Sequence, residues 1–289
     1  MPLRAIPVLF AVMLAASPAA ATTRDWQKTF TVSGRPLVTI RTNDGRIRVH
    51  SGPAGHVDAD VHYESHAWGW TSPSREPEVD MNQTGNEVTV VAREPSVWSF
   101  FGTVFLRLEI DVTVPSDCDL AVVSGDGSVR IEGPVNGKVA VDSSDGSIRV
   151  HDVKGDLRLT AADGAIEADG VDGDLYVRAS DGRVSVAGRF DRLDVHAADG
   201  RVEAEIERGS QLREEWRLET RDGSLHVRIP RNLAAELDAH TGEGSIRFDL
   251  PVEVNGRLDH HTIRGLLNGG GPPLRLRTDD GSLTLGVSD

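Results

Sequence analysis

Aspartates recur in this 289-residue sequence directly before a glycine, and they are the first side chains whose type and spacing could do chemistry. Pairs of carboxylates can serve as general acid and base in the hydrolysis of sugars, and aligned carboxylate oxygens can bind calcium. An aspartate at this position can also accept hydrogen bonds from the backbone of its own turn. Because this structural role accounts for the recurrence, we expect no catalytic residue, no cofactor and no metal. Structural calcium at the Asp-Gly turns stays open as an alternative.

Other nucleophile and ligand motifs are missing around these turns. Serine follows several of the glycines, as at Ser128 and Ser147, but the Gly-x-Ser-x-Gly sequence of a nucleophile elbow does not surround it. The glycine-rich stretch 269–273 lacks the Lys-Ser or Lys-Thr of a phosphate-binding loop. The single cysteine, Cys118, cannot form an intrachain disulfide. The sequence therefore predicts a protein that is not an enzyme.

The balance of acidic and basic residues limits the kinds of molecule that the protein is expected to bind. Asp and Glu number 45 against 31 Lys and Arg, which gives a formal net charge of −14 at pH 7. A protein that binds a nucleic-acid backbone needs clustered positive charge, so we expect no nucleic-acid partner. The same charge opposes attraction to anionic lipid. We expect as partner an unknown envelope protein, a surface ligand or, by self-association, a second copy of the chain.

Residues 1–21 have the pattern of a secretory signal peptide. One positive charge at Arg4 is followed by an apolar run from Ile6 to Ala16 and by small residues that end at Ala21. The apolar run is too short to span a membrane, which takes roughly 20 residues. We therefore expect cleavage after Ala21 and export to the periplasm or the cell surface, with no transmembrane segment in the mature chain.

The elements that position the aspartates form a repeat of about 18 residues. Apolar residues alternate on both sides of each Asp-Gly pair, as at Leu157, Leu159 and Ala161, which is the pattern of short strands. Asp-Gly between such runs also favours a β-hairpin, so an antiparallel meander competes with a β-solenoid. The fixed period favours the solenoid, because each stacked coil must present the same faces to its neighbours.

We therefore expect an all-β solenoid with two short strands in each coil of about 18 residues. Glycine tolerates a positive φ, which the turns between the strands would require. The predicted structural turn glycines are Gly45, Gly127, Gly146, Gly164, Gly182, Gly200, Gly223 and Gly281.

Residues 63–112 interrupt the repeat. We expect a single domain over residues 22–289, with this interruption as an inserted β-hairpin region. Seven of the 14 aromatic residues lie between Tyr63 and Phe105. Aromatic rings carry much of the energy of protein interfaces, but the same rings could instead form the core of the hairpin. The candidate partner contacts are Trp68, Trp70, Trp98, Phe100 and Phe101.

The signal peptide, the Val-Thr-Val-Pro sequence at 112–115 and the Ser-Gly-Asp-Gly series together resemble the bacterial putative-adhesin family of unknown function. That family consists of DUF-type β-solenoids related to head-GIN domains. The resemblance spans about residues 28–289 and implies a β-solenoid in the cell envelope with no established catalytic motif. Some relatives look like partners in envelope-stress regulation.

Residues and resemblance together predict a non-enzymatic, exported envelope protein that acts as an adhesin-like binding or scaffold module. The alternative is a carbohydrate-active β-helix enzyme that acts on an envelope or extracellular polysaccharide.

Overall fold

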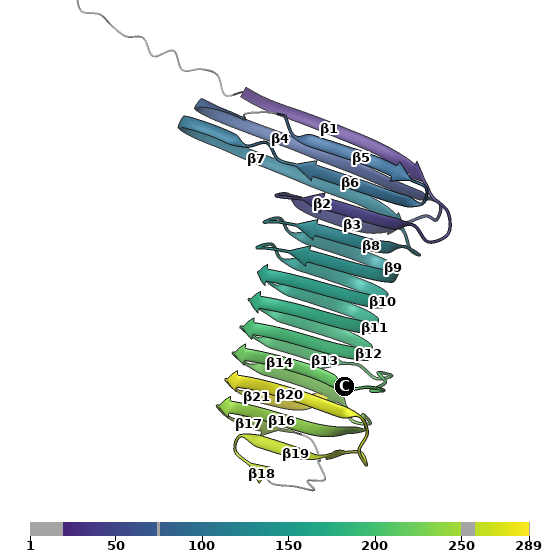
Figure 1. The fold of residues 1–289 in the computed structure, drawn as a ribbon, viewed down its shortest axis with the longest axis vertical. Coiled ribbons are helices and arrows are strands. Elements are labelled where there is room, and N and C mark those ends of the chain that lie inside the picture. The colour runs from purple at the N-terminus through teal and green to yellow at the C-terminus, as the bar shows by residue number, and fades with distance from the viewer. Residues whose placement is uncertain (1–19, 74–75, 250–257, 289) are drawn as a thin grey trace, which may run out of the picture.

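The structure is a computed structural model that describes residues 20–73, 76–249 and 258–288. Strands and the turns between them make up this part of the chain (Figure 1). Within it, no helix is long and apolar enough to pass through a lipid bilayer. The predicted signal peptide lies outside the described residues except for Ala20 and Ala21, where the first strand begins.

The described part contains twenty-one strands, which join into one hydrogen-bonded sheet. The N-terminal strands are β1 (Ala20–Thr31), β2 (Leu37–Thr42), β3 (Arg46–Gly52), β4 (His56–Pro73), β5 (Glu78–Thr84), β6 (Glu87–Arg93) and β7 (Val97–Pro115). The middle strands are β8 (Asp119–Ser124), β9 (Val129–Ser143), β10 (Ile148–Asp163), β11 (Ile166–Asp181), β12 (Val184–Asp199) and β13 (Val202–Ile206). The C-terminal strands are β14 (Trp216–Asp222), β15 (Leu225–Pro230), β16 (Ala235–Glu243), β17 (Ile246–Phe248), β18 (Leu258–Asp259), β19 (Thr262–Leu267), β20 (Pro273–Asp280) and β21 (Leu283–Ser288).

Neighbouring coils pair in parallel, with equivalent residues side by side. β10 pairs with β11 so that Ile148 lies beside Ile166 and Leu157 beside Leu175, and β11 pairs with β12 in parallel too. The offset between β10 and β11 equals the 18-residue period of the sequence. A meander would instead pair successive strands antiparallel. The predicted all-β solenoid is confirmed.

Each of the long strands β9–β12 contributes both sides of a coil, because it bends in the middle. In β10 the bend falls at Asp152, which has a φ of +59° and interrupts the register with β9. Stacked coils repeat the same buried positions, so the core is a set of apolar columns that runs through the stack. Full burial of one such aliphatic side chain contributes roughly 1.5–3 kcal/mol. The buried positions of β10 are Ile148, Val150, Val153, Leu157, Leu159 and Ala161.

Small hydroxyl side chains fill the core where it reaches the Asp-Gly turns. The Oγ of buried Ser143 donates a hydrogen bond to the carbonyl oxygen of Gly146 at 3.1 Å. In the same way, the hydroxyl of Thr241 donates to the carbonyl oxygen of Gly281 at 2.8 Å. These bonds satisfy backbone carbonyl groups next to the apolar core. They also fix the edge of the molecule that carries the aspartates.

Glycine is required at the turns for two different physical reasons. Gly182 has a φ of +132°, and a Cβ there would lie 2.4 Å from the carbonyl oxygen of Gly164 in the neighbouring coil. Gly127 and Gly146 are not among the residues with positive φ, so the expected reason is wrong for them. At Gly146 a Cβ would lie 2.0 Å from the carbonyl oxygen of Gly127. The close approach of neighbouring coils therefore excludes a side chain at both kinds of turn.

Both terminal coils are inserted into the stack rather than placed at its ends. β2 pairs in parallel with β6 on one side and with β8 on the other, and β3 lies likewise between β7 and β9. At the C-terminal end, β20 lies between β14 and β16, and β21 lies between β15 and β17 (Figure 1). These terminal strands are therefore hydrogen-bonded along both edges.

Antiparallel strands close the two ends of the stack. β5 pairs antiparallel with β6, while β4 pairs with β7 and β1 with β4. At the other end, β19 pairs antiparallel with β16. An uncovered strand edge offers free N–H and C=O groups to another chain. The antiparallel strands therefore cover edges through which the coils would otherwise aggregate.

The predicted insertion at residues 63–112 leaves the coil series only in part. β6 and the second half of β7 form a coil that stacks on β2 and β3. The rest of the segment forms β5 and the long antiparallel pair of β4 with β7. Sequence analysis missed this coil because residues 93–108, which include part of the long pair of β7 with β4, stand where the neighbouring coil has its Asp-Gly turn.

Alanine at two glycines tests the requirement for close approach. Gly182→Ala forces a Cβ against the Gly164 carbonyl oxygen in a left-handed backbone conformation, which should cost roughly 1–3 kcal/mol from the backbone alone. Gly286→Ala is the matched control, because its Cβ meets nothing within 4 Å, so it should be neutral or slightly stabilising. Chemical denaturation followed by circular dichroism measures both. Equal losses of stability would show that the assigned coil register is wrong.

Candidate functional site

The aspartates of the turns form a ladder of carboxylates along one edge of the molecule. Register pairs join Asp163 to Asp181, Asp181 to Asp199, Asp199 to Asp222 and Asp222 to Asp280. Loss of solvent contact, and then the carboxylates of Asp199 and Asp280, raises the pKa of Asp222 above its ordinary value. Within the described part of the chain, no group of three or more His, Cys, Asp or Glu side chains is placed to hold a metal ion. The calcium hypothesis therefore gains no ligand set from these residues.

At the N-terminal end of the ladder, Glu94 joins Asp44 and Asp126 around a hollow of about 360 Å³. Burial, and then the negative charge of Asp44, raises the pKa of Glu94 from its ordinary 4.5 to about 7. Burial and the charge of Asp126 raise the pKa of Asp44 as well. Arg107 also lines the hollow, but its guanidinium binds Glu109 at 3.0 Å. Glu94 is therefore an acid that can exchange its proton near neutral pH.

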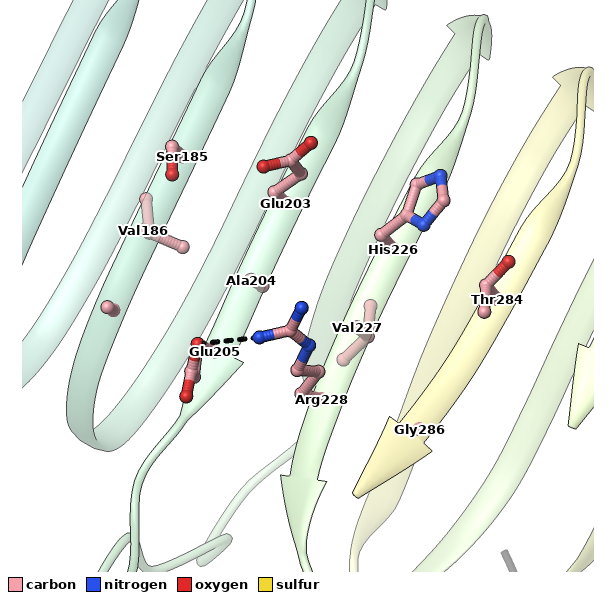
Figure 2. Close-up of a pocket in the computed structure, with 11 residues that line it drawn as sticks. Ser185, Val186, Glu203, Ala204, Glu205, His226, Val227, Arg228, Thr284 and Gly286 are labelled. Atoms are coloured by element: carbon pink, nitrogen blue, oxygen red, sulfur yellow. Dashed lines mark hydrogen bonds and ion pairs between the residues drawn. The ribbon is translucent and has the colours of Figure 1, made fainter. Parts of the chain in front are cut away.

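A shallow groove of about 330 Å³ crosses the outer surface of β12, β13, β15 and β21 (Figure 2). Small residues at Ala187 and Gly286 create it, because the equivalent positions on β13 and β15 carry the longer side chains of Glu205 and Arg228. Sequence analysis missed this groove, because Gly286 joins the row only through the insertion of β21 beside β15, which the sequence does not indicate. Two outward rows line it: Ser185, Glu203, His226 and Thr284, and Ala187, Glu205, Arg228 and Gly286.

The two carboxylates of the groove are the nearest approach to a catalytic pair. Glu203 and Glu205 share one side of β13, roughly 7 Å apart along the strand, which is a separation that inverting glycosidases use. Both carboxylates are already ion-paired, Glu203 with Arg201 at 3.3 Å and Glu205 with Arg228 at 3.2 Å. Both ion pairs are exposed, so the groove is better described as a polar contact surface than as a site of acid–base catalysis.

The predicted contact residues lie on a part of the molecule that we call the arm, residues 20–24, 63–73 and 97–108. Here β4 and β7 run past the ends of the coil strands as an antiparallel pair, with β1 along β4 (Figure 1). The backbone register brings the two aromatic segments together, with Trp70 beside Phe101 and Ser72 beside Trp98. The side chains of Trp68, Trp70, Trp98, Phe100 and Phe101 lie outside the described part of the structure.

Phe105 is an arm residue that sequence analysis did not single out as a contact. Its side chain is 69% exposed, and its backbone pairs with His66 of β4. Tyr63 and Leu108, at the base of the arm, are buried in the core. The sequence did carry a signal for this exposure, because Phe105 lies two residues from Arg107 and therefore on the same, outward side of β7. The arm therefore combines a buried base with an aromatic ring in solvent.

The family model described as Toastrack DUF4097 matches residues 38–286, which is most of this chain. The match begins in β2 and ends in β21, so it includes the whole stack of coils. No curated protein matches the chain.

Three solved structures are similar to this chain, each at 11% identity. One from Parabacteroides merdae ATCC 43184, described as a putative adhesin, covers 91% of this chain and 96% of its own, with a TM-score of 0.47. One from Parabacteroides distasonis ATCC 8503, described as a putative lipid binding protein, covers 90% and 96%, with a TM-score of 0.48. One from Clostridium sporogenes ATCC 15579, described as a putative cell adhesion protein, covers 92% and 100%, with a TM-score of 0.30. These likenesses concern the fold alone.

The raised pKa of Glu94 makes stability depend on pH. In the folded protein Glu94 keeps its proton up to about pH 7, whereas an ordinary glutamate loses it near 4.5. Its favourable contribution is therefore present below pH 4.5 and is lost as the pH rises through 7. Because the side chain is only half-buried, we expect the loss to be about 1 kcal/mol.

Glu94→Gln should therefore stabilise the protein by about 1 kcal/mol at pH 8 and leave it unchanged at pH 4. Thermal unfolding at the two pH values measures the difference. Glu87→Gln, at the exposed first position of β6, the strand that ends just before Glu94, is the control for the change in net charge. An effect of Glu94→Gln that is equal at both pH values would contradict the assigned pKa.

Proposed function

The chain belongs to the Toastrack DUF4097 family, and from this premise we propose that it is an exported, non-enzymatic binding or scaffold module of the cell envelope. In this proposal the signal peptide directs residues 22–289, as one domain, to the periplasm or the cell surface. The partner is an envelope protein or a surface ligand, and the contact is made by the arm. Self-association through the arm is the competing arrangement. The link to envelope-stress regulation that the sequence resemblance implies would make that partner a regulatory protein.

The observation that carries the proposal is the projection of the arm beyond the coils with an aromatic ring in solvent. Phe105 is 69% exposed, against 39% and 40% for the other exposed large apolar residues of the described part, Leu37 and Val123. In the register of β4 with β7, the backbone of Trp70 pairs with that of Phe101 farther along the same arm, which supports the proposal. Exposed aromatic groups are the residue types that bind most strongly in protein interfaces.

The coils are suited to hold such an arm in place. Buried Ile110 and Val112 continue β7 from the arm into the coil that stacks on β3. The arm therefore shares one strand, without a hinge loop, with the main core. A contact surface built on such a continuous strand is positioned by the packing of the core. This supports a scaffold that presents the arm to a partner.

The enzyme alternative receives less support from the geometry. A glycosidase needs one carboxyl group that holds a proton and another that is ionised beside the sugar. In the groove, Glu203 and Glu205 are both exposed and ion-paired with arginines, so their surroundings do not distinguish an acid from a base. The remaining surface aspartates repeat at the turns, where the fold accounts for them.

Acrylamide quenching of tryptophan fluorescence tests whether the arm is a contact surface. In a Trp26→Phe background, the emission comes from the three tryptophans of the arm and from Trp216, which is buried. We expect acrylamide to quench most of this emission and an added envelope extract to protect it, because exposed rings would be covered by the partner. Rings that resist quenching from the start would show that the arm is a hydrophobic cap.

Two pairs of substitutions distinguish specific binding by the arm from nonspecific adsorption through exposed apolar residues. Trp70→Ser/Phe101→Ser alters a register pair of the arm, whereas Leu37→Ser/Val123→Ser removes exposed apolar groups elsewhere. We expect the first pair to abolish protection of the remaining tryptophans and the second pair to preserve it. Turnover of an envelope polysaccharide that Glu203→Gln abolishes would overturn the non-enzymatic proposal.

A further inference from the structure

Three arginines lie in register on neighbouring parallel strands of the outer surface. The backbone register places Arg48 of β3 beside Arg130 of β9, and Arg130 beside Arg149 of β10. Side chains at such positions are separated by roughly 4.8 Å. Like charges directly opposite one another destabilise a sheet. The alignment therefore has an energetic cost that something must offset.

Most other surface bases of the coils lie opposite an acid. Lys138 lies beside Asp156 and Lys154 beside Asp172 in the strand register, with ion pairs at 3.7 and 3.8 Å. Farther along, Arg228 lies beside Glu205 and pairs with it at 3.2 Å. In the stack of arginines, Arg48 also lies beside Asp111 and Arg149 beside Glu167. Arg130 departs from the pattern, because it lies between the two other arginines.

The protein shows how it accommodates one aligned arginine pair. Arg217 of β14 lies beside Arg275 of β20. The carboxylate of Glu215 binds both guanidinium groups. A single bridging oxyanion therefore neutralises the repulsion, with one oxygen directed to each arginine.

Arg130 and Arg149 have no shared carboxylate among the described residues. Arg130 pairs with Glu132 at 3.6 Å, and Arg149 pairs with Glu167 at 3.3 Å on its other side. Both guanidinium groups stay about half exposed. A guanidinium has five N–H donors, so each retains donors for a further anion.

The space between these arginines is a hollow of about 290 Å³. Ser128 is the small residue that leaves room for it, and Val129 lies at its base. No carboxylate is among the described residues that line it, because the acidic partners lie at its margins. Its lining is Arg46, Arg48, Ser128, Val129, Arg130 and Arg149.

We propose that this hollow binds a tetrahedral oxyanion, a phosphoryl or sulfuryl group, which bridges Arg130 and Arg149 as Glu215 bridges Arg217 and Arg275. Arginine suits such a ligand because its planar fork pairs with two oxygens at once. Arg46 and Arg48 also line the hollow, where they pair with Glu109 and Asp111, and their remaining donors can contact further oxygens of the ligand. The anion can be a free ion or a group on a polymer, and both sources share this chemistry.

The net charge of −14 does not oppose binding at this position. Salt at physiological strength screens charges farther than about 8 Å, and the aspartate ladder lies on the edge of the coils rather than among the hollow's lining residues. Each of the four lining arginines has an acidic partner outside the lining, so an anion in the hollow would bind through the remaining guanidinium donors rather than through a surplus of positive charge. The predicted absence of a nucleic-acid partner is unaffected, since this is one small site and not an extended basic surface.

Calorimetric titration with inorganic phosphate, at constant ionic strength, tests the site. We expect saturable binding at roughly millimolar concentration and at least a tenfold loss of affinity in Arg130→Gln/Arg149→Gln. The matched control is Arg228→Gln/Arg264→Gln, which removes the same charge from two exposed ion pairs elsewhere. Long-chain polyphosphate as a second probe distinguishes the sources, because tighter binding per phosphate would identify a polymer as the natural ligand.

Unfolding temperature supplies a second readout. Without phosphate, Arg130→Gln/Arg149→Gln should melt at or above the wild-type temperature, because the repulsion between aligned charges is removed. The increase in melting temperature that phosphate gives the wild type should be absent from this variant. No saturable binding of either probe by the wild type, or equal weakening in both double variants, would overturn the proposal.

Discussion

The close approach of neighbouring coils at the Asp-Gly turns is the contact on which the rest of the structure depends. A side chain at Gly182 would lie 2.4 Å from the carbonyl oxygen of the glycine one coil away, so the turns can stack only when glycines align with glycines. That alignment sets the register of the strands that enter and leave each turn. Apolar residues then meet apolar residues in the core, as Ile148 meets Ile166. Ser143 and its equivalents tie the turn carbonyls to the core from inside.

Because of the same register, the outward side chains of successive coils line up in columns along the surface. The charge and size of the side chains in a column determine what that column can bind. Columns in which acid follows base, as at Lys154 and Asp172, neutralise themselves through an ion pair at 3.8 Å. The departures from this pattern stand out because the coils are otherwise alike. They are the groove beside Ala187, the aligned arginines Arg130 and Arg149, and the arm with exposed Phe105. Any binding function must reside in such departures, since the repeated positions serve the fold.

Much of this architecture could be predicted from the sequence, because a period of 18 residues and alternation around Asp-Gly leave few alternatives. The order in which the coils stack could not be predicted from the sequence. Nothing near Leu37 or Leu274 indicates that their strands insert between two others, since an inserted coil and a terminal coil bury the same residues. One coil could not be recognised because residues 93–108 stand in place of its Asp-Gly turn. Among the candidate binding surfaces, the aromatic segments could be found from the sequence, because aromatic residues are concentrated in them. The groove and the arginine hollow depend on small side chains, at Ala187 and Ser128, whose effect appears only after stacking.

Disulfide formation between engineered cysteines tests the register and the coil order most directly. In the structure Thr284 lies between His226 and Arg247, beside both, at a separation that a disulfide can span. His226→Cys/Thr284→Cys and Arg247→Cys/Thr284→Cys should therefore cross-link on mild oxidation. His226→Cys/Arg247→Cys should not, because β21 separates the two strands. Cys118 is buried and does not compete. Cross-linking of His226→Cys/Arg247→Cys without the other two would show that the coils stack in sequence order, and it would contradict the inserted C-terminal coil.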